Sequence, residues 1–317
     1  MRARMEQSAV RLLRNMFRVG LFENPYIQPE NSQAVVGKAD FMQAGYQAQL
    51  QSVVMLKNKA KTLPLAKGKT VFIPKRYTPA GRNFLGVPIP EKLDYPVNLT
   101  IVKKYFNVTD NAADADYALV FIANPDSGGG YSSEDAKAGG SGYVPISLQY
   151  RDYTAQQTRD PSLAGGDPLE KFTNRTYNGK STKTINSSDL TMALDTYTSM
   201  KGKPVIVAVQ LNQPAIMGEF EKQADAILAH FSVQDQALMD LLTGASEPSG
   251  LLPMQLPADM KTVEAQAEDV LRDMTCYKDS DGNTYDFGFG LNWKGVIRDR
   301  RTSTYQKPAL KVRPSGE

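Results

Sequence analysis

Four continuous apolar runs mark the centre of this chain. They are Thr70–Pro74, Ala115–Ile122, Lys203–Leu211 and Ala224–Phe231. Runs of this length without polar alternation are typical of strands that are covered on both faces of a parallel sheet. Stretches with helical period separate or follow them, at 39–57, 95–106, 188–200, 216–222 and 234–243. Because strands and helices alternate, the pattern predicts an α/β fold with a mainly parallel sheet.

The first residues have the pattern of a helix with one apolar face. Val10, Leu13 and Phe17 recur at helical spacing, and Gly20 is placed to end the helix. A helix of this kind at the start of a chain usually docks onto a neighbour. The segment Arg11–Tyr26 therefore predicts a contact with a further domain.

A long polar insertion, Asn124–Ser187, follows the clearest central strand. Loops of this length inside a compact domain are usually functional or disordered. The insertion starts at the carboxyl end of a strand, where α/β sheets place their ligands, and this position favours a functional role. A mobile surface excursion is the alternative interpretation.

Composition and charge argue against a nucleic-acid-binding or membrane-spanning protein. Of the 317 residues, 41% are hydrophobic and 22% are charged, as in an ordinary globular protein, and the net charge of +3 leaves no basic surface for nucleic acid. The longest apolar runs are strand-sized, so we expect a soluble protein without a membrane span. Cys276 is the single cysteine, which excludes an intrachain disulfide and a cysteine metal cluster and leaves the compartment open. No secretory signal is evident in the chain as given, because arginines interrupt its first apolar residues.

Several stretches agree in order and spacing with one known family. They are RVGLFENPY (Arg18–Tyr26), SVVMLKNKAKTLPL (Ser52–Leu65), ADYALVFI (Ala115–Ile122), KPVIVAVQLNQP (Lys203–Pro214) with ADAILAHF, TGASEPSGLLPMQLP (Thr243–Pro257) and YDFGFGLNW (Tyr285–Trp293). Through them the chain resembles the C-terminal domain of glycoside hydrolase family 3 enzymes, which are similar to β-glucosidases.

The resemblance implies a three-layer α/β sandwich, with a mainly parallel six-stranded sheet and helices on both faces. It also implies a division of the chain. Residues 1–66 are expected to form interdomain junction helices and a linker, and residues 67–297 the sandwich with its insertion at about 124–187. Independently of the resemblance, the excess of Lys and Arg over acids in residues 298–317 predicts a basic, disordered tail.

The resemblance further implies an activity, the removal of a sugar from the non-reducing end of a β-linked glucoside or oligosaccharide with retention. Retention needs two carboxyl groups about 5 Å apart. In the family the nucleophile is an aspartate on a catalytic barrel, so no residue here takes that role. We expect this chain to supply part of the sugar site beside a barrel in cis or in trans. The alternative is a non-catalytic carbohydrate-binding or structural remnant of such an enzyme.

The second carboxyl group is missing from its family position. The family carries a Glu just past the central strand, and here Ala123 stands there. Asp126, Glu134 and Asp135 are the substitutes nearby, and Glu134 is preferred because a longer side chain on a flexible loop suits a carboxyl that folds back over a sugar. The alternative is that all three are solvated loop acids.

Aromatic residues in the same insertion are candidates for binding sugar. Tyr131, Tyr143 and Tyr150 are spaced through it with Arg151, and Tyr153 follows. Aromatic faces stack on sugar rings and Arg donates to hydroxyl groups, so these residues are candidates for a subsite. Equally, the tyrosines are candidates for packing the insertion onto the sheet.

The remaining sequence patterns predict no phosphate, catalytic or calcium site. The glycine-rich stretches complete no phosphate-binding motif, and His230, the single histidine, lacks a G-x-S-x-G elbow, so we expect it to be structural. Asp279–Asp286 departs from the spacing of a calcium loop and predicts a turn. No motif calls for a metal or an organic cofactor.

Overall fold

The computed structural model describes residues 2–82, 85–156, 176–266 and 273–305. The chain divides into two compact units, Met1–Gln47 and Ala48–Glu317. Among the described residues, no helix combines the length and the apolar character that crossing a bilayer requires.

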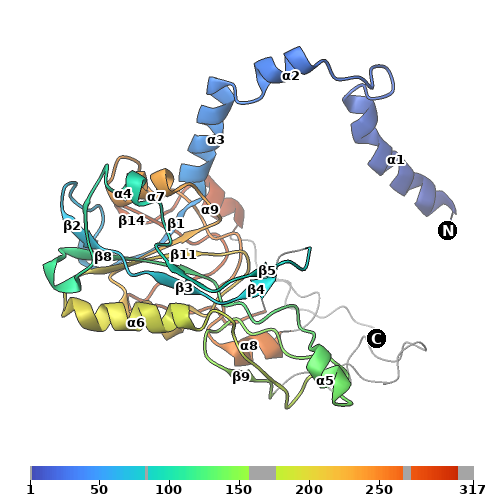
Figure 1. Cartoon of the computed structure of the whole chain (residues 1–317). Coiled ribbons are helices and arrows are strands. Elements are labelled where there is room, and N and C mark those ends of the chain that lie inside the picture. The colour runs from blue at the N-terminus through green and yellow to red at the C-terminus, as the bar shows by residue number, and fades with distance from the viewer. Residues whose placement is uncertain (1, 83–84, 157–175, 267–272, 306–317) are drawn as a thin grey trace. The chain divides into compact units, whose positions relative to one another are not determined.

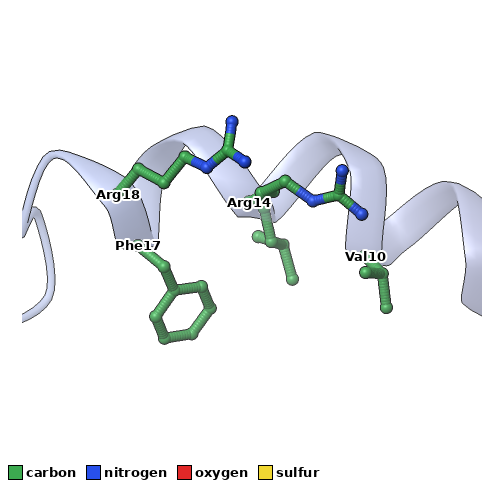
Figure 2. A pocket seen from close by; sticks show the side chains of 5 residues that line it. Val10, Arg14, Phe17 and Arg18 are labelled. Atoms are coloured by element: carbon green, nitrogen blue, oxygen red, sulfur yellow. The ribbon is translucent and has the colours of Figure 1, made fainter.

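The first unit is helical. It contains α1 (Arg2–Arg18), α2 (Pro29–Val35) and the start of α3 (Ala39–Ser52). The predicted N-terminal helix is confirmed, and Gly20 follows it with a positive φ of 69°. No residue of α1 is buried, and Val10 and Phe17 point to the same side of the helix with Arg14 and Arg18 beside them (Figure 2).

The second unit is built on an eight-stranded mixed sheet with the strand order β14-β13-β1-β12-β11-β8-β2-β7. Five neighbouring strands are parallel: β12 (Ala226–His230), β11 (Val205–Gln210), β8 (Tyr117–Ala123), β2 (Thr70–Phe72) and β7 (Asn107–Thr109). The other three run antiparallel to their neighbours at one edge: β1 (Val54–Asn58), β13 (Leu291–Asn292) and β14 (Gly295–Val296). The predicted mainly parallel sheet is confirmed, with eight strands in place of six.

Helices cover both faces of the sheet, as predicted. The connection from β8 to β11 carries α6 (Ser188–Met200), and the connection from β2 to β7 runs the opposite way and carries α4 (Leu99–Val102). Because parallel crossovers are right-handed, connections in opposite directions place their helices on opposite faces. Accordingly, α6 lies on one side of the sheet, whereas α4 and α7 (Asp235–Leu242) lie on the other (Figure 1).

One predicted element is wrong. The segment 39–57 was expected to be helical throughout, but α3 ends at Ser52 and the next residues form β1. Val54, Met55 and Leu56 are completely buried, and the strand pairs with β12. The apolar run satisfies its backbone groups in the sheet and buries both faces at once, which a surface helix cannot do. The predicted junction, residues 1–66, therefore contains a strand of the sheet, β1, near its C-terminal end.

Smaller elements lie outside this sheet. A hairpin arm, residues 76–94, pairs β3 (Arg76–Thr78) with β6 (Lys92–Asp94) and β4 (Gly81–Arg82) with β5 (Pro88–Ile89). The insertion contains α5 (Ser133–Lys137) and a ribbon of β9 (Tyr153–Thr154) and β10 (Ser181–Thr182). Later elements are α8 (Met260–Ala265) and α9 (Arg300–Tyr305), so the expected disordered tail begins with a helix, and its remainder, 306–317, lies outside the described residues.

A buried ion pair links the first strand of the sheet to the C-terminal part of the chain. Lys57 on β1 places its Nζ 2.6 Å from Oε1 of Glu221, and both side chains are completely buried. Glu221 also accepts hydrogen bonds from the hydroxyls of Tyr277 and Ser280. Burial alone would raise the pKa of Glu221, but the hydrogen bonds from Lys57, Ser280 and Tyr277 together outweigh it and hold the pKa below its ordinary value. The carboxylate is therefore charged and fully partnered.

We predict that Lys57→Met lowers the free energy of unfolding by about 3–5 kcal/mol, because it leaves a buried carboxylate without its cation. The double variant Lys57→Met/Glu221→Leu should regain most of that loss. Urea denaturation measures both. Lys59→Met is the matched control, because Lys59 is exposed and 3.7 Å from Asp225, and it should cost less than about 1 kcal/mol. Equal losses for the two lysine variants would contradict the prediction.

Candidate functional site

The strand order creates a switch point between β2 and β8. From β2 the chain passes to β7 on one side, whereas from β8 it passes to β11 on the other. Ligands of open α/β sheets bind outside the carboxyl ends of the strands at such a point. The hairpin arm follows β2 and the insertion follows β8, so two long excursions of the sheet start at neighbouring strand ends. We call this region, around Arg76 and Ala123, the strand-end site.

A buried carboxylate organises the strand-end site. Asp189, in the first turn of α6, accepts two hydrogen bonds from the guanidinium of Arg76, at 2.7 and 2.8 Å. Its Oδ2 also accepts from the backbone N–H of Ala123 at 3.2 Å and from Nδ2 of Asn186 at 2.9 Å. Sequence reasoning missed this group, because 113 residues separate Arg76 from Asp189 and no local motif joins them. With its oxygens occupied by donors, Asp189 positions the strand end and is no free acid.

Tyr150 fixes the insertion to the same strand end. Its ring is completely buried, and its hydroxyl donates to the carbonyl oxygen of Ala123 at 2.6 Å. Burial raises the pKa of Tyr150 well above its ordinary value, so the hydroxyl stays a donor. The backbone N–H groups of Tyr150 and Arg151 both donate to Glu219. Tyr150 was a candidate for stacking on sugar, but a ring with no exposed face is placed here for packing.

The other aromatic candidates meet at the tip of the insertion. Tyr131 and Tyr143 form an antiparallel bridge, and their rings contact edge to face with centroids 6.1 Å apart. Tyr131 is 61% exposed. A side chain at Gly142 would collide with the Tyr131 ring, so glycine allows the close approach. The pair presents an aromatic surface to solvent. Arg151 is also exposed, and its Nη1 lies 3.3 Å from Glu219.

The three candidate carboxyls have different surroundings. Oδ2 of Asp135 accepts from Nζ of Lys180 at 2.6 Å and from the N–H of Gly142 at 2.7 Å. The hydrogen bond from Lys180 lowers the pKa of Asp135, so this carboxylate pins the tip to the β9–β10 ribbon. Glu134 lies in the first turn of α5 with its side chain exposed. Asp126 is exposed closer to the strand end, and its Oδ1 accepts from the N–H of Gly128.

His230 lies at the carboxyl end of β12 and is 7% exposed. Its Nδ1 is buried and has no hydrogen-bond partner in the described part of the chain. Burial lowers the pKa of His230 to about 4, so the ring is neutral at physiological pH. No described group of three or more His, Cys, Asp or Glu side chains is placed to hold a metal ion.

We predict that Asp189→Asn lowers the free energy of unfolding by about 3 kcal/mol, since it removes the charge that compensates Arg76 and puts an amide N–H₂ where a carboxylate oxygen accepts hydrogen bonds. Chemical denaturation measures the loss. Asp195→Asn is the matched control because Asp195 is exposed on the same helix, and it should change stability by less than about 0.5 kcal/mol. A loss no larger than that of the control would show that Asp189 does not organise the strand end.

We predict that His230 makes the fold sensitive to mild acid. The unfolded histidine binds a proton below its ordinary pKa of 6.5, whereas the folded one resists protonation down to about 4. Its contribution to stability is therefore present above pH 6.5 and is lost as the pH falls toward 4. Relative to His230→Leu, the native chain should lose about 1.5 kcal/mol between pH 6.5 and about 5, measured by denaturation at each pH. Parallel pH profiles for the two proteins would refute this.

Comparison with known proteins gives a consistent result. Residues 53–293 match the family described as "Glycosyl hydrolase family 3 C-terminal domain". The chain is 28% identical over 293 residues to "Probable beta-glucosidase C" of Aspergillus flavus, an alignment that covers 92% of this chain and 35% of that protein. It is 24% identical to the "Periplasmic beta-glucosidase/beta-xylosidase" of Dickeya chrysanthemi, covering 91% of this chain and 34% of that protein.

Solved structures share the fold. A beta-glucosidase from Listeria innocua, crystallised in complex with gluconolactone, superposes with a TM-score of 0.50 at 18% identity. The superposition covers 92% of this chain and 39% of that one. This chain thus spans about a third of the length of the curated relatives it matches.

Proposed function

Because this chain belongs to the family of glycosyl hydrolase family 3 C-terminal domains, we propose that it serves as the second domain of a retaining, exo-acting β-glycosidase of the β-glucosidase type. A β-linked glucoside or oligosaccharide is the proposed substrate, and a catalytic barrel domain, in cis or in trans, is the proposed partner. The observation that carries the proposal is the family match over 53–293, together with relatives named beta-glucosidases of which the chain covers about a third.

The division of labour follows from the chemistry. Hydrolysis with retention needs two carboxyl groups about 5 Å apart, one as nucleophile and one as acid/base. The family resemblance assigns the nucleophile to the barrel. This chain then contributes loops at the strand-end site, and the apolar side of α1 contributes a contact with the barrel.

We assign the acid/base role to Glu134 in preference to Asp126. Asp135 and Asp189 are held by cations and backbone N–H groups, so neither is available to transfer a proton. Glu134 is exposed and projects from a helical turn that is itself fixed by the Asp135–Lys180 pair. Asp126 has a shorter side chain, and one of its oxygens accepts from Gly128.

The sugar-binding surface in this proposal is the aromatic tip. Tyr131 offers an exposed ring beside Tyr143, and Arg151 offers an exposed guanidinium. Aromatic rings pack on the apolar faces of sugars, while guanidinium donors bind hydroxyl groups. Tyr150 supports this surface from within, by tying the insertion to Ala123.

One observation favours a second candidate, a non-catalytic carbohydrate-binding or structural domain. Ala123 occupies the position at which the family supplies its carboxylate, and an alanine transfers no proton. The two candidates differ in a single measurable respect, because only the first requires Glu134 or Asp126 for turnover.

We predict that the chain alone leaves an aryl β-glucoside intact, and that turnover appears when a family 3 barrel domain is added. Glu134→Gln should lower kcat of the mixture for a substrate with a poor leaving group by about 100-fold or more, because general acid catalysis contributes 100- to 10,000-fold. A substrate whose leaving group needs no protonation should be affected less, and added azide should restore product formation as a glycosyl azide.

Asp152→Asn is the matched control, since Asp152 is an exposed carboxylate of the same insertion, and it should leave turnover unchanged. Loss of turnover in Asp126→Asn but not in Glu134→Gln would move the role to Asp126. Sugar binding with no turnover in any mixture would favour the non-catalytic candidate. Turnover by the chain alone would refute the division of labour.

A further inference from the structure

Glu219 is a nearly buried carboxylate beside the insertion. It closes the short 3₁₀ turn η3 (Met217–Glu219) in the connection that follows β11, and its side chain is 8% exposed. Burying a carboxylate is unfavourable unless donors satisfy its oxygens. The donors to Glu219 therefore identify the segment that it serves.

Within the described part of the chain, the donors to Glu219 all come from two consecutive residues of the insertion. The N–H of Tyr150 donates to Oε2 at 2.5 Å, and the N–H of Arg151 donates to Oε1 at 3.2 Å. Nη1 of the Arg151 side chain donates to the same Oε1 at 3.3 Å. One carboxylate therefore holds both the backbone and the guanidinium of Arg151.

The turn that carries Glu219 is itself firmly placed. Phe220, the next residue, is buried, and its ring contacts the Tyr150 ring edge to face with centroids 6.3 Å apart. Just before the turn, the N–H of Ile216 donates to the carbonyl oxygen of Leu148 at 2.8 Å. The turn is thus joined to the insertion by ring packing and by a backbone hydrogen bond, and Glu219 acts from a fixed position.

The contact with Glu219 leaves most of the Arg151 side chain available to a ligand. A guanidinium has five N–H donors, and Glu219 accepts from one of them. The side chain is 61% exposed, and its other donors have no acceptor among the described residues. Tyr150 is tied to the carbonyl oxygen of Ala123, so the residue before Arg151 is anchored at the strand-end site. A side chain that is already held in place loses less conformational freedom when it binds a ligand.

We propose that Glu219 is a positioning residue that holds the Arg151 guanidinium in place to bind a sugar hydroxyl. This inference rests on the proposed function, because it takes Arg151 as a sugar ligand. Glu219 itself does not touch the sugar. Its removal should raise KM and leave kcat unchanged, because a binding contact that is present both before and during the reaction affects KM alone. A residue that only stabilised the fold would instead reduce the active fraction, which lowers the apparent kcat at an unchanged KM.

The first measurement follows the contact itself, on the whole chain without a barrel. Hydrogen exchange at the amides of Tyr150 and Arg151 should be about tenfold or more faster in Glu219→Gln than in the native chain, because both amides lose a charged acceptor. Asp152→Asn is the matched control, since Asp152 is an exposed carboxylate next to Arg151 and lies beside Lys183. The control should exchange as the native chain does.

The second measurement tests the consequence for the substrate, with a family 3 barrel domain added and an aryl β-glucoside as the probe. Glu219→Gln and Arg151→Met should each raise KM by about tenfold and leave kcat within about twofold. The double variant should raise KM no further than either single variant, because the two residues act as one unit. Arg151→Met changes an exposed side chain, so it should keep the native melting temperature, and it serves alone if Glu219→Gln does not fold.

The outcomes separate the inference from the proposed function. Faster exchange together with a higher KM supports the inference. Unchanged exchange in Glu219→Gln, or an unchanged KM in Arg151→Met, overturns it and leaves the proposed function standing. A lower kcat at an unchanged KM in Glu219→Gln also overturns it, because the carboxylate then only packs the insertion. Absence of turnover by the native chain with the barrel overturns the proposed function, and the role of Arg151 as a sugar ligand falls with it.

Discussion

The carboxylate of Asp189 is the constraint on which the candidate site depends. One buried group accepts from a guanidinium on the arm, from the backbone at the end of β8 and from an amide at the end of the insertion. Three segments distant in sequence are thereby fixed at one point. Since burying a carboxylate is unfavourable unless every lone pair is satisfied, the three segments must be in place together. The hydrogen bonds of Asp189 therefore fix the base of the strand-end site, where Arg76, Ala123 and Asn186 meet.

The same logic accounts for three other described carboxylates. Glu219 holds the N–H groups of Tyr150 and Arg151, Glu221 holds Lys57, and Asp135 holds Lys180. For Glu219 burial outweighs its hydrogen bonds and raises the pKa, whereas in Glu221 and Asp135 the hydrogen bonds prevail and lower the pKa. Of the three candidate carboxyls, structural use removes Asp135 and leaves Glu134 and Asp126.

The fold was predictable because its central strands are all buried on both faces. Strands such as β8, β11 and β12 are covered on both faces, so the sequence shows unbroken apolar runs. Strand β1 escaped prediction since its apolar run continues directly from a helix, and only its pairing with β12 separates the two. The candidate site was less predictable. Tyr150 is of a residue type that often binds ligands, yet its complete burial gives it a packing role. Burial depends on the whole fold and cannot be read from the local sequence.

Under the proposed function, the exposure of the loops gives a reason for a second domain beyond the missing nucleophile. A carboxyl group that donates a proton near neutral pH requires a partly desolvated setting. Glu134 and Tyr131 are both exposed on the insertion. In that proposal, a partner surface over the insertion would exclude water from the sugar and desolvate the acid in one step. The chain would then form one wall of a cleft whose base is fixed by Asp189.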